Sequence, residues 1–181
     1  MFVRQKLNQL SRQDFSRKGS IDKPVENIVK KINKNDSYYT TSSCSGRIII
    51  LTDEKKHKTK WQFVSHNKIT LNELKKSLKS LPEKLLWFRF EPMILHIACK
   101  TIEDAQNIID KAKSAGFKHS GIMASGKRIM AEIRGTDFIS AIISRNKKSI
   151  VNENYLKILI AEANKKLKRN LIKIKKFEKI L

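Results

Sequence analysis

Apolar residues in this chain recur with two spacings, and each spacing predicts one type of secondary structure. Over 22–32 and 101–115 they return every three or four positions, which is typical of a helix with one buried face. The run Ile48-Ile49-Ile50 is instead short and β-branched, which favours a buried strand. Thr70 with Glu73 has the spacing of a capping box, a usual helix start. The pattern therefore predicts helices and strands within one fold.

The order of the predicted elements indicates an α+β fold with a mixed or mostly antiparallel sheet and packed helices. No Gly-x-Gly-x-x-Gly motif follows a strand, so a doubly wound dinucleotide-binding sheet is not expected. We expect one α+β domain over 1–150, with a basic C-terminal helix, 151–181, packed on it. Residues 137–144 are short, apolar and ambiguous. The expected elements are helices over 2–16, 22–32, 70–81, 101–115 and from 152 onward, and strands over 46–52, 59–65, 85–90, 93–98, 117–123 and 127–134.

One segment, Ser37 to Ile50, concentrates chemically useful side chains. It holds two tyrosines, six hydroxyl residues, a thiol, a glycine and an arginine. Residues 42–47 predict a tight polar loop before the strand, whose hydroxyls and N–H groups could hold an anion or a polar ligand. Gly46 would permit close approach of the backbone to that ligand. A β-turn whose serines bond their own backbone explains the composition equally well.

Charge is the strongest signal in the composition. Against 17 acidic residues stand 39 Lys and Arg, a formal net charge of +22. Such a surface attracts polyanions, and nucleic acid is the commonest such partner. A solubility or high-temperature adaptation would normally raise Glu together with Lys, and here the acids lag behind. The charge balance therefore favours a nucleic-acid partner.

The remaining composition bounds the compartment. The two cysteines, Cys44 and Cys99, are too few for a disulfide framework, which favours a reduced, cytoplasmic protein. No segment approaches the roughly 18 apolar residues of a membrane span, so we expect a soluble protein with no membrane partner. Nothing in the sequence fixes the oligomeric state.

Five segments together resemble a known family. They are Lys18-Gly-Ser-Ile-Asp22, Tyr38-Tyr-Thr-Thr-Ser-Ser-Cys-Ser-Gly-Arg47, Trp61 to His66, Arg89-Phe-Glu-Pro-Met-Ile-Leu-His96 with Cys99, and Gly116-Phe-Lys-His-Ser-Gly-Ile122. In order and spacing, over roughly residues 10–145, this set resembles the wybutosine-synthesis methyltransferases, the third protein of the tRNA wybutosine pathway.

The resemblance implies an activity, a cofactor and a partner. Members of this family are described as S-adenosyl-L-methionine-dependent enzymes acting on tRNA(Phe). They methylate a ring nitrogen, N4, of the 4-demethylwyosine-type tricyclic base at position 37. Because the dinucleotide fingerprint is missing here, the fold is not expected to be a typical Rossmann methyltransferase.

Methyl transfer to a ring nitrogen mainly requires alignment, and a nitrogen that carries a proton also requires a base. His66, His96 and Glu91 are the catalytic candidates, because each is expected at a strand edge or beside a turn. A lone histidine more often has a structural role, and Glu91 could equally pair with a neighbouring cation. Candidate cofactor-binding residues are the small and polar ones of two turns: Ser42, Ser43, Cys44, Ser45, Gly46, Arg47, Ser120 and Gly121.

Candidate RNA contacts are basic or aromatic. Cations bind phosphates and aromatic rings stack on bases, although strand-flanking aromatics such as Trp61 are more often core. The basic C-terminal helix could grip phosphate or simply pack by its apolar stripe, and we expect both. The candidates are Lys18, Tyr38, Tyr39, Lys165, Lys166, Lys168 and Arg169.

The sequence also allows two alternatives to the enzyme, a zinc site and a non-catalytic RNA-binding module. Cys44, Cys99, His66 and His96 have the ligand types of a zinc site, but their spacing matches no zinc ribbon, so no metal is expected. The chain could also be a non-catalytic RNA-binding module. That alternative predicts salt-sensitive tRNA binding and no interaction with the cofactor.

Overall fold

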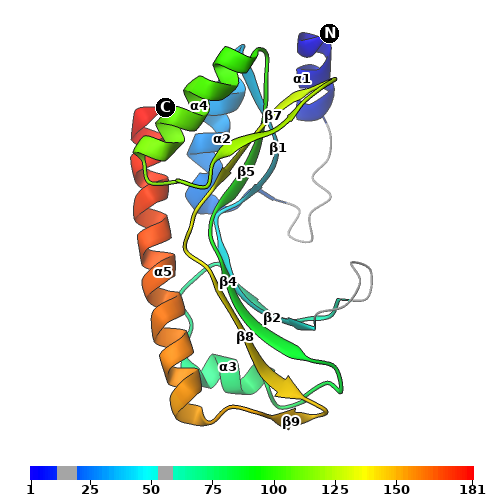
Figure 1. Cartoon of the computed structure of the whole chain (residues 1–181), viewed down its shortest axis with the longest axis vertical. Helices are drawn as coiled ribbons and strands as arrows, with labels where there is room; N and C mark the ends of the chain where they lie inside the picture. The colour runs from blue at the N-terminus through cyan, green and yellow to red at the C-terminus, as the bar shows by residue number, and fades with distance from the viewer. Residues whose placement is uncertain (12–19, 53–58) are drawn as a thin grey trace. The chain divides into compact units, whose positions relative to one another are not determined.

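A computed structural model describes residues 1–11, 20–52 and 59–181 and divides them between two compact units (Figure 1). Unit 1 comprises 1–45, 93–136 and 171–181, and unit 2 comprises 46–92 and 137–170. This division differs from the expected body over 1–150 with an appended helix. The difference arises because each unit builds its own sheet from strands that are far apart in the sequence.

The α+β prediction is confirmed, and each strand pair among the described residues is antiparallel. The helices are α1 Phe2–Leu10, the 3-10 helix η1 Lys23–Val25, α2 Glu26–Lys34, α3 Leu71–Ser77, α4 Ile102–Ser114 and α5 Glu153–Ile180. The strands are β1 Tyr38–Cys44, β2 Arg47–Thr52, β3 Trp61–Ser65, β4 Leu86–Glu91, β5 Ile94–Cys99, β6 Gly121–Ser125, β7 Ile129–Arg134, β8 Ile139–Arg145 and β9 Lys148–Ser149.

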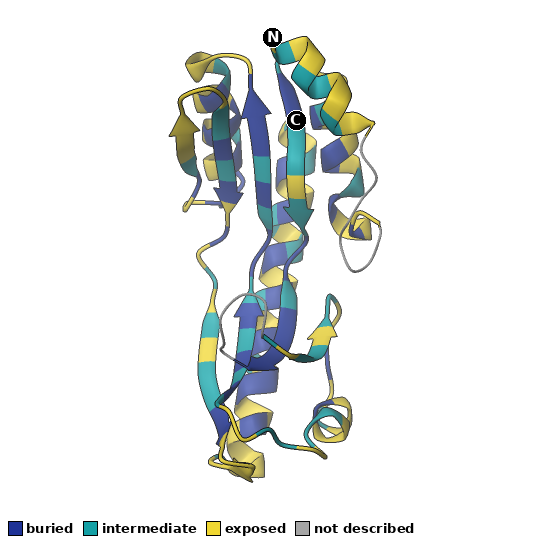
Figure 2. Cartoon of the chain, turned by 90° about the vertical axis from the view of Figure 1, so that its right-hand side faces the viewer, coloured by how far each residue is buried: buried dark blue, intermediate teal, exposed yellow. Residues whose placement is uncertain are grey.

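Unit 1 contains a four-stranded sheet in the order β1-β5-β7-β6. One face of this sheet packs against α2, α4 and the end of α5, and alternate residues of β5, such as Leu95 and Ile97, supply its buried side chains. Figure 2 shows these buried positions as dark bands along the strands. The intervening residues of β5, including His96, belong to the opposite face, which we call the open face.

Unit 2 contains a five-stranded sheet in the order β3-β2-β4-β8-β9. Strand β2 lies between β3 and β4, and residues Ile48 to Thr52 are all buried. Strand β4 alternates between buried and half-buried residues, with Phe88 and Phe90 fully buried. The ambiguous segment 137–144 proves to contain most of β8, which pairs with β4.

The serine-rich segment departs from the sequence prediction. Residues 42–44 of the loop expected over 42–47 belong to strand β1, Arg47 begins β2, and only Ser45 and Gly46 separate the two strands. The segment pairs with β5 with one irregularity between Thr40 and Ser42, and Ser and Thr side chains are small enough to alternate across a sheet. Gly46 has a φ of +96°, a conformation that glycine adopts without strain.

Helix starts follow the sequence signals more closely than helix ends, since the helix expected over 70–81 ends at Ser77. Capping boxes start α3 at Thr70 and α4 at Thr101. The first helix, expected over 2–16, is observed to Leu10, and 12–19 lie outside the described residues. Helix α5 supplies its first part to unit 2 and its last part to unit 1. Within the described chain, no helix combines the length and hydropathy that crossing a membrane requires.

Candidate functional site

The open face of the unit 1 sheet carries a row of polar side chains. Ser42 of β1 lies opposite His96 of β5, and His96 lies opposite Glu132 of β7. Gly121 of β6 completes the row opposite Glu132. Residues opposite each other in paired strands share one face, so the three side chains meet side by side.

Hydrogen bonds join this row. Ser42 Oγ lies 2.8 Å from His96 Nδ1, and His96 Nε2 lies 2.9 Å from Glu132 Oε2. The His96 and Glu132 side chains are each 26% exposed, whereas Ser42 is exposed. Because an ionised carboxylate only accepts, Glu132 holds the proton of a neutral His96 on Nε2. The lone pair on Nδ1 then accepts the Ser42 hydroxyl proton.

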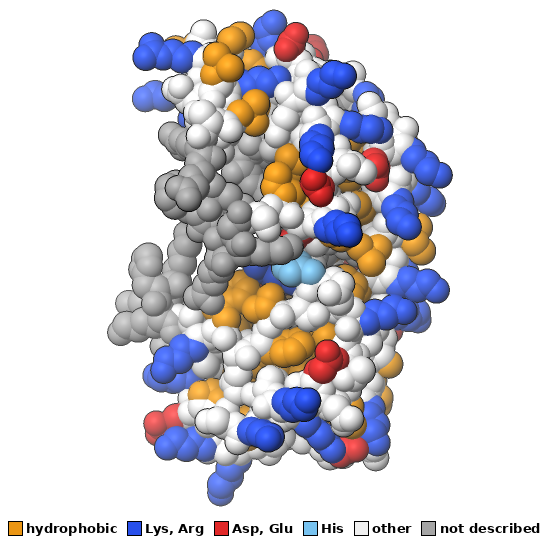
Figure 3. Space-filling view, turned by 180° about the vertical axis from the view of Figure 1, so that it is seen from behind, with side chains coloured by type: hydrophobic (Ala, Val, Ile, Leu, Met, Phe, Trp, Pro, Cys, Tyr) orange, Lys and Arg blue, Asp and Glu red, His pale blue; other side chains and the backbone are white. Residues whose placement is uncertain are grey.

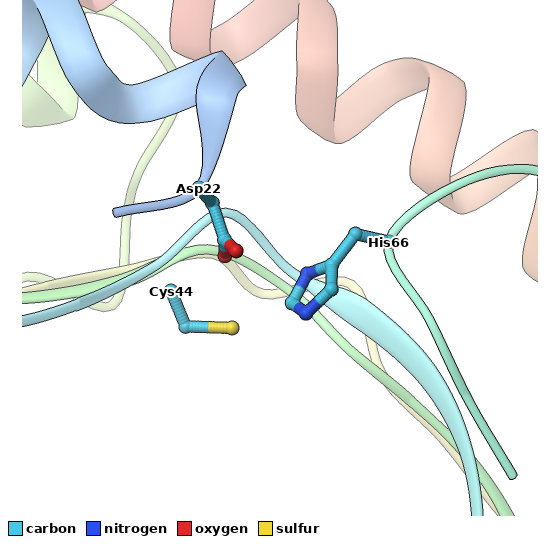
Figure 4. Close-up of side chains that lie close together, drawn as sticks. All are labelled: Asp22, Cys44 and His66. Carbon is cyan, nitrogen blue, oxygen red and sulfur yellow. The ribbon is translucent and has the colours of Figure 1, made fainter. Parts of the chain in front are cut away.

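The turn after β1 is held by a buried carboxylate. Asp22, 6% exposed, accepts a 2.8 Å hydrogen bond from the backbone N–H of Ser45. Asp22 precedes η1 but makes no side-chain capping bond to it, and its carboxylate bonds this turn instead. Its carboxylate and the thiol of Cys44 lie within 4.8 Å of each other (Figure 4). This corner of unit 1 therefore offers an acceptor and a thiol beside a constrained backbone.

Arg47 and Glu91 form an ion pair in unit 2. They lie opposite each other in β2 and β4, and Arg47 Nε donates to Glu91 Oε2 over 2.8 Å. The guanidinium carbon also lies 4.4 Å from the centroid of the Trp61 ring, within cation–π range. Each partner is 29% exposed. Glu91 therefore fixes Arg47 in an ion pair, the alternative role that the sequence allowed for Glu91.

His66, also labelled in Figure 4, belongs to unit 2, and its ring is hydrogen-bonded to a backbone carbonyl. Its Nδ1 lies 2.9 Å from the carbonyl oxygen of Gly46. A carbonyl only accepts, so Nδ1 carries the proton, and the neutral ring has its lone pair on Nε2. His66 therefore keeps the chemistry of a base or a ligand.

Several predicted site residues have structural roles instead. Ser43 lies opposite the buried Leu95, so its side chain is on the core face of β1. Ser120 is 7% exposed, donates to the carbonyl of Phe117 over 2.6 Å and accepts from the N–H of Arg134. Gly121 starts β6, with open space at its Cβ position. The serines therefore do not line one common loop.

The proposed stacking role of Tyr38 and Tyr39 conflicts with their burial. Tyr39 is 0% exposed and packs on Phe2, with ring centroids 5.2 Å apart. Tyr38 is 8% exposed, and its hydroxyl donates to the carbonyl of Asp104. Neither ring has a face free for a base, so both are core residues.

The zinc alternative also fails, because Cys99 lies on the core face of β5 and His96 on the open face.

Burial of Tyr38 predicts a loss of stability at alkaline pH. Burial, followed by the charge of Asp104, raises the pKa of Tyr38 to about 12 from 10.0. The folded state retains this proton longer, so the stabilisation is complete below pH 10.0 and lost as pH rises toward about 12. One group gives a slope of at most about 1.4 kcal/mol per pH unit. Urea titrations from pH 9 upward on wild type and Tyr38→Phe should show a shallower fall in the variant.

The exposed Tyr155 provides the matched control. Tyr155→Phe should leave the wild-type slope unchanged. Equal slopes in wild type and Tyr38→Phe would contradict the assignment.

The basic residues of α5 divide into two groups. Lys165 and Lys168 are exposed. Arg169 donates to Asp137 Oδ1 over 2.7 Å, and Lys166 lies 3.8 Å from the same oxygen and 3.3 Å from Glu162. Lys166 and Arg169 therefore neutralise one shared carboxylate. Lys18 lies outside the described residues. Figure 3 shows Lys and Arg side chains scattered over the face that it draws, with few acids among them.

The sequence did not identify Glu132 as a partner of His96, nor Asp22 as the residue that holds the turn after β1. Glu132 is the polar residue within the otherwise apolar run Ile129 to Ile133, a weak signal for an exposed strand position. Asp22 falls within a segment that resembles the family, but no local pattern there indicates its bond to the Ser45 turn. Strand pairing supplies the information that the sequence lacks.

Known proteins similar to this chain belong to one family of enzymes. The family model described as Methyltransferase TYW3 matches residues 3–181. The tRNA wybutosine-synthesizing protein 3 homolog of Danio rerio is 39% identical over 189 residues, covering 99% of this chain and 74% of the relative. The tRNA(Phe) 7-((3-amino-3-carboxypropyl)-4-demethylwyosine(37)-N(4))-methyltransferase 1 of Pyrococcus furiosus is 37% identical over 168 residues, covering 90% and 85%.

Solved structures agree with this similarity. The PH1069 protein from Pyrococcus horikoshii superposes with a TM-score of 0.89 at 35% identity, covering 99% of this chain and 96% of that protein. A hypothetical protein from Aeropyrum pernix has a TM-score of 0.75 at 27% identity, covering 87% and 95%.

Proposed function

This chain belongs to the TYW3 methyltransferase family, and from that premise we propose that it methylates N4 of the 4-demethylwyosine-type base at position 37 of tRNA(Phe). The observation that carries the proposal is the activity in the names of the archaeal relatives, which match this chain over 90% of its length. Membership of an enzyme family also sets aside the non-catalytic RNA-binding alternative.

The proposed methyl donor is S-adenosyl-L-methionine, which supplies an electrophilic methyl group when bound. Asp22 is the carboxylate of this corner of unit 1, and a carboxylate accepts hydrogen bonds from the hydroxyl and ammonium groups that such a donor carries. Cys44 and the Ser45 turn add small polar groups in the same unit. In unit 2, Gly46 and Arg47 stay candidates for binding the donor, and His66 and Glu91 stay catalytic candidates.

Charge supports the tRNA part of the proposal. The formal net charge of +22 favours association with a polyanion, and exposed lysines such as Lys165 and Lys168 add to it. We therefore expect tRNA binding to weaken steeply as salt rises. The chain's own residues would orient the base, exclude water and remove the proton from its ring nitrogen.

The test is methyl transfer by the purified full chain. Isotope-labelled S-adenosyl-L-methionine is incubated with tRNA(Phe) carrying the 4-demethylwyosine-type base, and label in the digested nucleosides is located by mass spectrometry. We expect one methyl group on N4 of that base. The matched control is the same tRNA with guanosine at position 37, which should remain unlabelled. Calorimetric binding of tRNA with no label on the tricyclic base would overturn the proposed function.

A further inference from the structure

We propose that Ser42, His96 and Glu132 form a proton relay, in which Glu132 positions His96 and Ser42 takes the proton from the ring nitrogen of the substrate. The inference rests on the proposed function, because that function requires removal of a proton from a base nitrogen. It adds a positioning residue, Glu132, and assigns Ser42 to acid–base chemistry rather than to cofactor binding.

The relay is built into the register of the sheet. Ser42, His96 and Glu132 occupy directly opposite positions on three adjacent strands, β1, β5 and β7. The core face of the same strands is fixed by buried residues such as Leu95 and Ile133. A slip of one residue in either pairing would move these side chains into the core, so packing holds the row in place.

Both ring nitrogens of His96 are occupied within the row. Nδ1 faces Ser42 Oγ at 2.8 Å, and Nε2 faces Glu132 Oε2 at 2.9 Å. The ring therefore has no nitrogen left to contact a substrate directly. Ser42 is the exposed member of the row, whereas His96 and Glu132 are half-buried. A substrate proton would accordingly enter through the Ser42 hydroxyl.

The direction of transfer follows from the charges. Ionised Glu132 keeps the neutral imidazole protonated on Nε2, so Nδ1 accepts from Ser42. As the ring nitrogen of the substrate bonds to the methyl carbon, the bond from that carbon to the sulfonium sulfur breaks, and both its electrons stay on sulfur. The substrate proton passes to Ser42 Oγ while the Ser42 proton passes to Nδ1. The resulting imidazolium is stabilised by the Glu132 carboxylate beside it.

The kinetic test uses Ser42→Ala, an exposed position whose change should preserve the fold. Single-turnover methyl transfer should fall by about 10²–10⁴-fold, the usual contribution of general acid–base catalysis. The dissociation constants for S-adenosyl-L-methionine and tRNA should stay within about twofold, since the rate effect is catalytic. Ser42→Thr keeps a hydroxyl and should recover most of the rate. Wild-type rates in Ser42→Ala, or equal losses in Ala and Thr variants, would overturn the relay.

The positioning role of Glu132 has a readout that does not depend on activity. In ¹⁵N-labelled protein near neutral pH, we expect the neutral form of His96 to carry its proton on Nε2. Glu132→Gln replaces a group that only accepts with an amide that can also donate to Nε2, so the share of the neutral ring protonated on Nε2 should fall. An unchanged tautomer in Glu132→Gln would refute the role of Glu132.

Two controls test for non-specific effects, and failure of the proposed function can be told apart from failure of the relay. The exposed His119 and Glu103 provide His119→Gln and Glu103→Gln, which should change neither the rate nor the His96 tautomer. If the wild-type protein transfers no methyl group, the proposed function fails. The nuclear magnetic resonance experiment would then still decide whether Glu132 sets the state of His96.

Discussion

Phe177→Ala will lower the free energy of unfolding by about 3–5 kcal/mol, the usual cost of removing a buried aromatic ring. Phe177 is 0% exposed in the unit 1 core and meets Phe117 edge to face, with ring centroids 6.0 Å apart. Urea denaturation followed by circular dichroism measures the loss. The expected loss of stability is large because the last turns of α5 form part of the unit 1 core.

Phe138 provides the control for this substitution, because the same residue type is 46% exposed there. Phe138→Ala should cost less than about 1 kcal/mol, as expected away from a packed core. Comparable losses in the two variants would mean that Phe177 does not contribute as a core residue. A transition that splits in Phe177→Ala, with one part unchanged, would identify unit 2 as the surviving part.

Replacing Lys165 and Lys168 together with Gln will flatten the salt dependence of tRNA binding. Each phosphate contact that is lost should reduce the slope of log K against log salt by about 1. Lys165 is 67% exposed, and the nearest acidic oxygen, on Glu162, lies 3.9 Å away. Fluorescence titrations with tRNA(Phe) between about 50 and 200 mM salt span the range in which such slopes are resolved.

Lys166 and Arg169 are left unchanged in that variant for a structural reason. Both contact Asp137, whose side chain is 13% exposed, so neutralising them would remove two cations from beside a half-buried carboxylate. Lys113→Gln with Lys118→Gln removes the same charge from exposed positions in unit 1 and provides the control. Equal slopes in both double variants would assign the effect to net charge rather than to α5.

Local signals in the sequence predicted the elements well. The capping boxes at Thr70 and Thr101, the β-branched run of β2 and the spacing of α5 each depend on residues close together in the chain. Short-range hydrogen bonds and one-sided burial decide such elements, so their residues report them directly. The α+β class and the family resemblance followed from the same local patterns.

Long-range pairing set the limit of the prediction. Residues 42–44 resemble a polar loop in composition, and only pairing with β5 turns them into a strand. The same pairing sends Ser43 to the core face and Ser42 to the open face. Glu132 joins His96 across a sequence separation of 36 residues, which no local pattern encodes. From the sequence, Tyr38 and Tyr39 are candidates for stacking on RNA bases, because their burial depends on the same strand pairing and leaves no local signal.

The split course of α5 has a consequence for folding during synthesis. Unit 2 ends at residue 170, whereas the core of unit 1 needs Ile174 and Phe177 as well as strands made much earlier. Ribosomal synthesis delivers the chain from the N-terminus at about 5–20 residues per second, and domains generally fold as units. All of unit 2 is therefore synthesised before unit 1 is complete, although residues 1–45 of unit 1 are made first. A chain truncated after residue 170 should protect unit 2 from protease and leave 1–45 cleavable.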